Sequence, residues 1–521
     1  MRVVLLSLVI SFAAACGGGK HGQSVCDNQV PAPPACMTQC DPTPGAANTC
    51  PTGYHCTPDG FCDALCTPGG NECGDGYHCT TDGQCVGDGS CTGLECQVVD
   101  CTGMGMPDTT ISGVVYAPNG TLPLYGVTVY VPNSDPGPLP DGAQCSRCGD
   151  TLAGDPVVQT TTDEAGHFTL SGVPAGANIP LVIQSGKWRR QITIPNIGQC
   201  QDNALQADQT RLPKDHTEGD IPKIALTTGN ADSLECLIRK LGIADAEITN
   251  SSGTGRVNFY DGNGVSKFDA NWAGGGGQTF SSATNFWNDV NNLKPYDIVI
   301  LSCEGAQNPD TKPQAALDAM KAYADLGGRV FMSHWHNIWI EGSTEGGGSQ
   351  APAVWPQIAQ WSNGGNTPDP ITDTIDEIHN PKGASFATWM LNVMGSTTRD
   401  EITVHEGRTT CSTVDDTKAE RWTYWQDGNN QETQNFQFTT PNEADPGARC
   451  GKVVFSDMHV SGSIDTSKSY PTSCGNSTDL TPQEKALAFM LFDLSSCVGQ
   501  IGREQPQSSQ LNASTVPAAR L

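Results

Sequence analysis

At 521 residues the chain is too long for a single hydrophobic core, because cores stop growing near ~250 to 300 residues, so we expect about three domains. Only 16% of its residues are charged, and 56 Asp and Glu against 28 Lys and Arg give a net charge of −28. This acidity disfavours nucleic acid and anionic lipid headgroups, so we exclude nucleic acid as a partner.

The amino terminus has the pattern of an export signal. Arg2 precedes an apolar run from Val3 to Phe12, which at about ten residues is roughly half of what a membrane-spanning helix needs. We therefore predict a signal peptide over residues 1–15.

The end of this signal is compatible with two kinds of processing. Ala13-Ala14-Ala15-Cys16 fits an ordinary A-x-A cleavage site, and it also resembles the lipobox of bacterial lipoproteins, although Ala13 stands where that motif usually has Leu. The resemblance implies a lipid on Cys16 that anchors the protein to a membrane, with residues 16–25 as a Gly-rich tether. We expect an outer-membrane or cell-surface lipoprotein, and secretion as a soluble protein is the alternative.

The cysteines predict disulfides. Of 23 cysteines, 22 remain without Cys16, an even number that can pair completely in an oxidising compartment. Thirteen of these lie between Cys26 and Cys101, where large apolar residues are too few to form a core. We predict that disulfides stabilise residues 26–105 in place of such a core.

An internal repeat lies within this segment. The run CPTGYHCTPDGFC from Cys50 recurs as CGDGYHCTTDGQC, so Cys50, Cys56 and Cys62 correspond to Cys73, Cys79 and Cys85. Each copy has an Asp-Gly turn sequence before its last cysteine. We predict small disulfide-stapled modules. Zinc bound with the help of His55 and His78 is the alternative, although such sites belong mainly to reducing compartments.

Short alternating strands separated by Gly and Pro turns are predicted next, from Thr110 to about Ile194. The runs Ile111–Val115, Gly126–Val129, Thr162–Leu170 and Val173–Gly176 resemble the carboxypeptidase regulatory-like family. This resemblance implies a seven-stranded, prealbumin-like β-sandwich over residues 106–200 with no catalytic role. Asp163 and Gly166 would form a hairpin turn, with Phe168 and Leu170 facing the core.

An insertion between Pro132 and Pro156 departs from the family pattern and carries the C-x-x-C motif of Cys145 and Cys148. A redox-active motif needs a helix amino terminus that lowers a thiol pKa, whereas this one lies in a Pro/Gly/Asp-rich loop. We predict that both are structural disulfide cysteines rather than a redox or metal site. His167 is expected to be exposed, and residues 201–220 are predicted to be a linker.

Strands and helices alternate from residue 221 to 498. Apolar strands are predicted at 223–227, 296–301 and 329–332, and helices at 234–241, 313–326, 381–394 and 482–494, the last with a capping box of Thr481 and Glu484. Apolar strands that alternate with helices favour a parallel sheet in an α/β, flavodoxin-like three-layer domain. Further strands are expected near 402–405 and 422–425, and the tail 499–521 is predicted to be disordered.

Three segments of this region resemble the class I glutamine amidotransferase-like superfamily, especially its trehalose-utilisation-type branch: Leu301–Gly305, Gly328–His336 and Gly451–His459. The resemblance implies that the second segment is the strand-turn that carries the nucleophilic cysteine of amidotransferases and that the third delivers a histidine. Here the turn offers Ser333 and His334 without the G-x-C-x-G or G-x-S-x-G spacing, so we expect the glutaminase reaction to be lost.

The carboxyl ends of parallel strands converge on a crevice where ligands bind, which makes the residues there candidates for chemistry. The catalytic candidates are His334, His336, His459, Asp457 and Cys303, with Glu304 beside them. The three histidines are the candidate ligands of a divalent metal, the only cofactor that we consider, and inert lining of the crevice is the alternative. Cys303 lies one strand too early to be the amidotransferase nucleophile, and we expect it to form a disulfide with Cys236.

A Gly/Asn/Pro/Trp-rich stretch between Glu341 and Asn380 is predicted to be a lid or an irregular insertion. Its residues Trp355 and Trp361 either stack on sugars or pack the loop against the domain.

These features predict a non-catalytic cell-envelope lipoprotein that presents an amidotransferase-like domain for binding a carbohydrate or protein. The alternative is a hydrolase or metal-dependent enzyme that uses the histidine-lined crevice. An enzyme requires His334, His336 or His459 within about 4 Å of one another or of Cys303 around an open pocket, whereas scattered or buried histidines favour binding.

Overall fold

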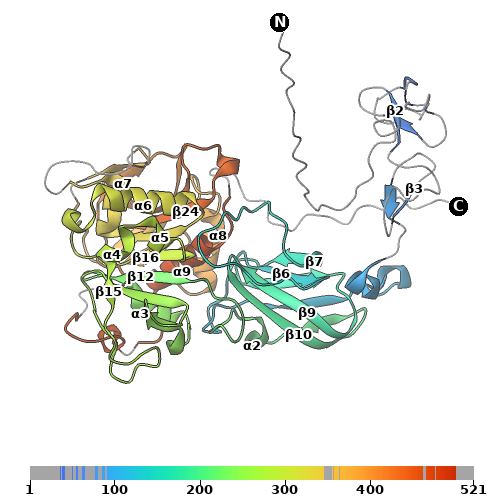
Figure 1. Cartoon of the computed structure of the whole chain (residues 1–521), viewed down its shortest axis with the longest axis horizontal. Helices are drawn as coiled ribbons and strands as arrows, with labels where there is room; N and C mark the ends of the chain where they lie inside the picture. Colours follow the sequence, from blue (N-terminus) through green and yellow to red (C-terminus); the bar gives the residue numbers. More distant parts are fainter. Residues whose placement is uncertain are drawn as a thin grey trace, which may run out of the picture. The chain divides into compact units, whose positions relative to one another are not determined.

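We describe the protein from a computed structural model. It describes short stretches between residues 36 and 87, and residues 91–499 except 345–354, 356, 363, 461–464 and 476. The chain is β-rich, with several sheets, some helices and several disulfides, and it divides into two compact units, Met1–Cys96 and Gln97–Leu521 (Figure 1). No helix among the described residues has both the length and the apolar character to cross a membrane.

The amino-terminal unit contains two short antiparallel strand pairs, one in each copy of the repeat. These are β1 (His55–Cys56) with β2 (Cys62–Asp63), and β3 (Tyr77–Cys79) with β4 (Cys85–Gly87). Cys56 stands opposite Cys62 and Cys79 stands opposite Cys85, so the two copies share one register. Disulfides join Cys50 to Cys62 and Cys91 to Cys96.

Several of the predictions for the amino-terminal region concern residues outside the described ones. These are the signal peptide, Cys16 and its tether, and Cys73. The side chains of Cys56, Cys79, Cys85, His55 and His78 are likewise outside the description, as is the tail from residue 500 onward.

The second unit begins with two facing sheets. One has the strand order β10-β9-β6-β7 and the other the order β11-β5-β8. Their bounds are β5 Thr110–Val114, β6 Thr128–Pro132, β7 Pro156–Thr161, β8 His167–Ser171, β9 Gly176–Ser185, β10 Trp188–Ile197 and β11 Asp202–Ala204. Phe168 and Leu170 are buried, as predicted, and the side chain of His167 is exposed. The prealbumin-like family assignment stays a prediction.

Two details of this region differ from the predictions. Asp163 and Gly166 do form a tight turn, in which the Gly166 amide donates to the Asp163 carbonyl, but the turn links β7 and β8, which belong to different sheets rather than to one hairpin. The segment 201–220 is not a free linker, because β11 pairs in parallel with β5 and the short helix α2 (Ala207–Thr210) follows it. Thr210 ties α2 to the sheet by donating to the Val114 carbonyl at 2.6 Å.

A large mixed sheet forms the rest of the unit. Its parallel part has the order β13-β14-β12-β16-β17-β24, and an antiparallel part continues it as β23-β22-β19-β20. The parallel strands are β12 Ile224–Thr228, β13 Ile248–Asn250, β14 Val257–Asp261, β15 Ser281–Ser282, β16 Ile298–Leu301, β17 Arg329–Ser333 and β24 Gly451–Ser456. The antiparallel strands are β18 Ala359–Trp361, β19 Ile371–Ile375, β20 Glu401–Val404, β21 Cys411–Val414, β22 Ala419–Asp427 and β23 Asn430–Thr440.

Helices lie on both sides of this sheet (Figure 1). They are α3 Leu234–Lys240, α4 Ala283–Trp287, α5 Val290–Leu293, α6 Gln314–Asp325, α7 Ile338–Glu341, α8 Gly383–Asn392 and α9 Pro482–Ser495. The core under α4 and α6 contains Trp287 and Tyr323 packed with Val299 and Val330 of the sheet. The predicted capping box of α9 is present, since Thr481 and Glu484 bond each other's backbone amides.

The stretch 341–380 is partly built into the sheet rather than forming an irregular insertion, because it supplies β18 and β19. Trp355 is completely buried, and its ring packs against Phe438 with centroids 5.5 Å apart. Trp361 packs against Phe455. Trp355 is therefore not available to stack on a sugar, and both rings hold their segment against the domain.

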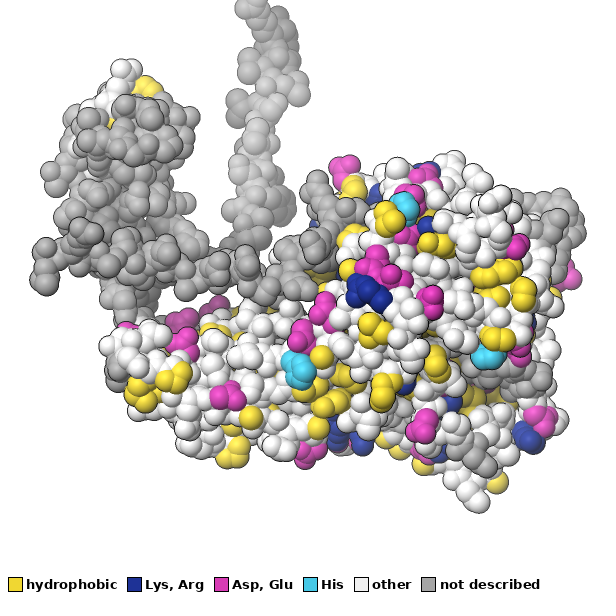
Figure 2. Space-filling view, turned by 180° about the vertical axis from the view of Figure 1, so that it is seen from behind, with side chains coloured by type: hydrophobic (Ala, Val, Ile, Leu, Met, Phe, Trp, Pro, Cys, Tyr) yellow, Lys and Arg dark blue, Asp and Glu magenta, His cyan; other side chains and the backbone are white. Residues whose placement is uncertain are grey.

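The two-sheet region and the large sheet belong to one compact unit and are covalently joined. Cys145 pairs with Cys450, and Cys148 pairs with Cys497, so the C-x-x-C cysteines form two long-range structural disulfides. Lys187 forms an ion pair with the buried carboxylate of Asp297 across the same junction. On the face drawn in Figure 2, acidic, basic and apolar side chains are interspersed.

Candidate functional site

The turn after β17 has an unusual backbone. The strand ends at Ser333, and His334 opens the 3-10 helix His334–Asn337 (η6) with φ of +40°, in the left-handed region that residues other than glycine rarely adopt. Such conformations cost about 1–3 kcal/mol and persist where the surroundings enforce them, often at functional sites. Here Ser333 is fixed by its hydroxyl, which donates to the Asp232 carboxylate at 2.5 Å. His334 thus occupies the turn at which the resemblance described above would place a nucleophilic cysteine.

Three neighbouring parallel strands bring Cys303, His334 and His459 together. β16 pairs with β17 and β17 with β24, so the loops that follow these strands meet at one edge of the sheet. The Cys303 sulfur lies 3.4 Å from Nδ1 of His334, and the rings of His334 and His459 have centroids 5.1 Å apart. One donor atom from each of the three residues lies within 4.8 Å of the other two. We call these three residues the Cys-His-His cluster.

The cluster is sealed from solvent. Cys303, His334 and His459 are 0%, 4% and 2% exposed. Among the described residues, Nε2 of His334 and both ring nitrogens of His459 have no hydrogen-bond partner. Buried polar atoms are normally paired, so three unpaired ring nitrogens in one place require an explanation.

Burial also decides the charge of the cluster. It lowers the pKa of His334 well below its ordinary value and the pKa of His459 to about 3, so both rings are neutral at neutral pH. It raises the pKa of the Cys303 thiol to about 12, although the backbone amides of Trp335 and Gly305 donate to the sulfur. The protein alone thus holds a thiol and two neutral imidazoles here.

His336 does not join the cluster, although the sequence analysis made all three histidines candidate ligands of one metal. The chain turns into η6 instead of continuing as a strand, so His334 and His336 do not project to the same side. Nδ1 of His336 accepts from the Trp339 indole at 3.0 Å, and its Nε2 lies 2.9 Å from the Ser302 carbonyl. Both ring nitrogens are satisfied, so His336 is a neutral packing residue.

Asp457 and Glu304 are also occupied by structural contacts. Asp457 accepts from the amides of Thr410 and Cys411 and so fixes the start of β21, and burial raises its pKa to about 7. Glu304 pairs with the buried ammonium of Lys312 at 2.8 Å. Neither belongs to the Cys-His-His cluster.

The predicted disulfide between Cys303 and Cys236 is wrong. Cys236 of α3 pairs with Cys474, and Cys303 is a free, buried thiol. Cys411 is free and buried as well, so the 22 cysteines do not pair completely. An oxidising compartment joins only sulfurs that the fold brings together. The sulfur of Cys303 faces His334 instead of another cysteine.

Asp232 is a site residue that the sequence analysis did not single out. It follows β12 and accepts from the Ser333 hydroxyl and from the Val460 amide at 2.8 Å, so it connects the segments that carry His334 and His459. Burial raises its pKa to about 6. Its position just after an apolar strand, beside the turn residues Gly229 and Asn230, was the available signal.

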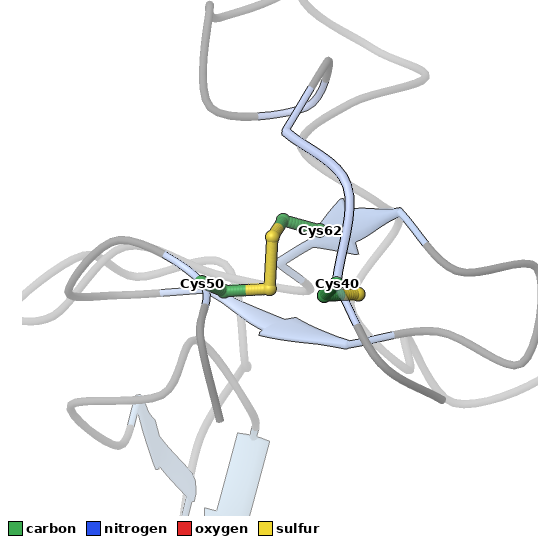
Figure 3. Close-up of side chains that lie close together, drawn as sticks. All are labelled: Cys40, Cys50 and Cys62. Atoms are coloured by element: carbon green, nitrogen blue, oxygen red, sulfur yellow. A yellow bond between two sulfur atoms is a disulfide. The ribbon is translucent and has the colours of Figure 1, made fainter. Parts of the chain in front are cut away.

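A second group of possible metal ligands lies in the amino-terminal unit. Figure 3 shows Cys40 close to the bond between Cys50 and Cys62. Cys40 is itself disulfide-bonded, so none of the three sulfurs is a thiolate. Because zinc binds thiolate and not disulfide sulfur, this group does not provide a zinc site.

The geometric condition set for an enzyme is therefore met in part. The 3.4 Å contact between Cys303 and His334 satisfies the distance, whereas both side chains are almost completely buried.

No family model matches the chain, and no curated protein matches it. Among solved structures it is similar to a ThuA-like protein of Bacteroides uniformis, at 11% identity, over 51% of this chain and 88% of that chain, with a TM-score of 0.28. A cohesin–X-dockerin complex of Acetivibrio cellulolyticus matches at 17% identity, over 28% of this chain and 76% of that chain, with a TM-score of 0.13. BcpA, the major pilin subunit of Bacillus cereus, matches at 12% identity, over 20% of this chain and 30% of that chain, with a TM-score of 0.13. At these scores no function is transferred.

Proposed function

We propose that the protein is a non-catalytic cell-envelope lipoprotein, anchored through Cys16, whose flavodoxin-like, amidotransferase-type domain binds a carbohydrate or protein partner. The burial of the Cys-His-His cluster carries the non-catalytic part of this proposal. A nucleophilic cysteine must reach its substrate as a thiolate, and Cys303 is fully buried with a thiol pKa raised by that burial to about 12.

The junction between the β-sandwich and the large sheet supports a presenting role. Two disulfides and the ion pair of Lys187 with Asp297 join the two parts, and the indole of Trp389 donates to the Pro123 carbonyl at 2.9 Å. A junction fixed in this way holds a binding surface in one orientation. The net charge of −28 favours partners other than nucleic acid.

A cysteine-dependent hydrolase is the second candidate, and one observation favours it. Cys303 and His334 are at hydrogen-bonding distance, the arrangement of a thiol nucleophile with its base. This function requires a movement that opens the cluster to substrate.

Thiol alkylation of the native, non-reduced full chain separates the two candidates. Cys303 and Cys411 are both free and buried, so Cys411 is a matched internal control. We expect iodoacetamide to label neither residue in the native protein and both after unfolding in guanidinium, as located by peptide mass spectrometry. Labelling of Cys303 at least about 100-fold faster than Cys411 would contradict the proposal and support the hydrolase. A glycan array and surface crosslinking then test the class of partner.

A further inference from the structure

We infer that Cys303, His334 and His459 form a buried binding site for one d10 metal ion, Zn²⁺ or Cu⁺. This goes beyond the proposed binding function and does not depend on it. A thiolate with two neutral imidazoles is a donor set that suits both ions, since thiolate selects copper(I) and zinc, and imidazole binds both metals.

The spacing of the donors supports a shared ion. Zinc lies about 2.3 Å from thiolate sulfur and about 2.0–2.1 Å from imidazole nitrogen, so two ligands of a tetrahedral site are about 3.3–3.6 Å apart. The distance of 3.4 Å between the Cys303 sulfur and Nδ1 of His334 already falls in this range. The third donor, on His459, lies within 4.8 Å of both, so ligation requires a side-chain shift of about 1 Å.

The unpaired nitrogens are an independent observation that points to a ligand. His459 is only 2% exposed, and neither of its buried ring nitrogens has a hydrogen-bond partner among the described residues. Leaving such a group unpaired costs free energy, which coordination of an ion at one of these nitrogens would offset in part. Neutral imidazole is also the form of histidine that binds metals.

The surrounding charges limit the net charge that a bound metal ion can bring to the cluster. Arg408 acts electrostatically on all three residues of the cluster, so additional positive charge is unfavourable there. Cu⁺ with the Cys303 thiolate is neutral overall, and the thiol proton leaves to solvent when the ion binds. Zn²⁺ with the thiolate carries one positive charge, which the nearby carboxylate of Asp232 can balance.

The Cys-His-His cluster differs from the cysteine group of the amino-terminal unit in the oxidation state of its sulfur. There the three sulfurs also lie within 4.8 Å of one another, but they are already oxidised to disulfides. In the Cys-His-His cluster the sulfur is a free thiol, and oxidation has no second cysteine in that donor group to join it.

Metal analysis of the purified full chain tests the site directly. We expect about one equivalent of zinc or copper by inductively coupled plasma mass spectrometry, and its loss in Cys303→Ser and in His459→Asn. His405→Asn is the matched control, because His405 is an exposed histidine paired with Asp369, and it should keep the metal. Cys411→Ser is the second control, because it removes a buried thiol outside the cluster.

Cobalt substitution keeps the test decisive if a variant fails to fold. After removal of bound metal with a chelator, wild-type protein should bind about one equivalent of Co²⁺ and show a thiolate-to-cobalt charge-transfer band in the near ultraviolet. Titration with Cu⁺ in the presence of a competing copper(I) chelator distinguishes the two ions. At a copper site, Cu⁺ should displace bound zinc. Absence of both bound metal and the cobalt band in folded wild-type protein would overturn the inference, as would a band that Cys303→Ser retains. Either a bound metal or burial can protect Cys303 from alkylation. Repeating the alkylation on metal-free protein shows which of the two protects it.

Discussion

The two disulfides at the junction offer a quantitative test of how its parts are held together. Cys145–Cys450 and Cys148–Cys497 close loops of 305 and 349 residues. With either one intact, the other closes only a small additional loop, made of the 3 residues from position 145 to 148 and the 47 from position 450 to 497. That loop has about 50 residues, so in the chain-entropy account its closure contributes about 4 kcal/mol, against about 6 kcal/mol for a loop of 305 residues.

Replacing one pair, Cys148→Ser with Cys497→Ser, should therefore lower the free energy of unfolding of the second unit by up to about 4 kcal/mol. Replacing the other pair, Cys145→Ser with Cys450→Ser, should cost the same, because the same loop is opened. Replacing all four should cost up to about 10 kcal/mol, more than the two pairs together. None of the four is fully buried, so loss of packing adds little.

Guanidinium unfolding of the full chain, followed by tryptophan fluorescence and far-ultraviolet circular dichroism, measures these changes. The control is Cys91→Ser with Cys96→Ser, which opens a disulfide of the other unit and should leave this transition unchanged. A fourfold variant no less stable than either pair, or two pairs that differ by several kcal/mol, would refute the loop argument.

Further predictions concern single residues. Glu235 is fully buried, and neither of its carboxylate oxygens has a hydrogen-bond partner among the described residues. Burial raises its pKa to about 8, so the folded state holds this proton more tightly than the unfolded state does. Stability therefore falls as pH rises from about 4.5 to 8. Glu235→Gln should remove this slope of about 1.4 kcal/mol per pH unit, and parallel stability curves of variant and wild type across that range would contradict it. His336→Ala should lower stability by about 1–3 kcal/mol in denaturant titrations, because it leaves the Trp339 indole unpaired, yet it should leave metal content unchanged. Cys16→Ala should move the protein from the membrane to the soluble fraction, and its retention in the membrane would exclude the lipid anchor. Mild reduction should melt the amino-terminal unit at a lower reductant concentration than the second unit, which limited proteolysis can follow.

Much of the architecture could be predicted from local patterns. The apolar runs at 223–227, 296–301 and 329–332 do form parallel strands, and the Thr481 capping box starts α9. These features depend on residues close in sequence, whose side-chain periodicity and hydrogen bonding decide the local conformation. In the antiparallel part, β20 and β22 coincide with the strands expected near 402–405 and 422–425. Strands β18 and β19 were not predicted, because they lie in a Gly- and Pro-rich stretch with little periodicity.

The candidate site was predicted in composition but not in arrangement. The late strand and the turn after 329–333 indicated His459 and His334, and the structure brings these two together with Cys303. The predicted disulfide of Cys303 is wrong, whereas Cys303 as a candidate site residue does lie in the cluster. His336, another candidate, lies outside the cluster. Two residues of separation place side chains on one side of a strand, but the chain turns at His334 with a positive φ, and only the surrounding loops impose that turn.

The sequence by itself determined where the apolar parallel strands and the longer helices form, and it predicted that the amino-terminal third depends on disulfides. Only the tertiary structure decided which cysteines are bonded, which are left free, and which histidines face each other, because those outcomes depend on distances between segments separated by up to 349 residues. Backbone periodicity acts over a few residues, whereas a sulfur or an imidazole meets the atoms that the packed fold places within a few ångströms of it.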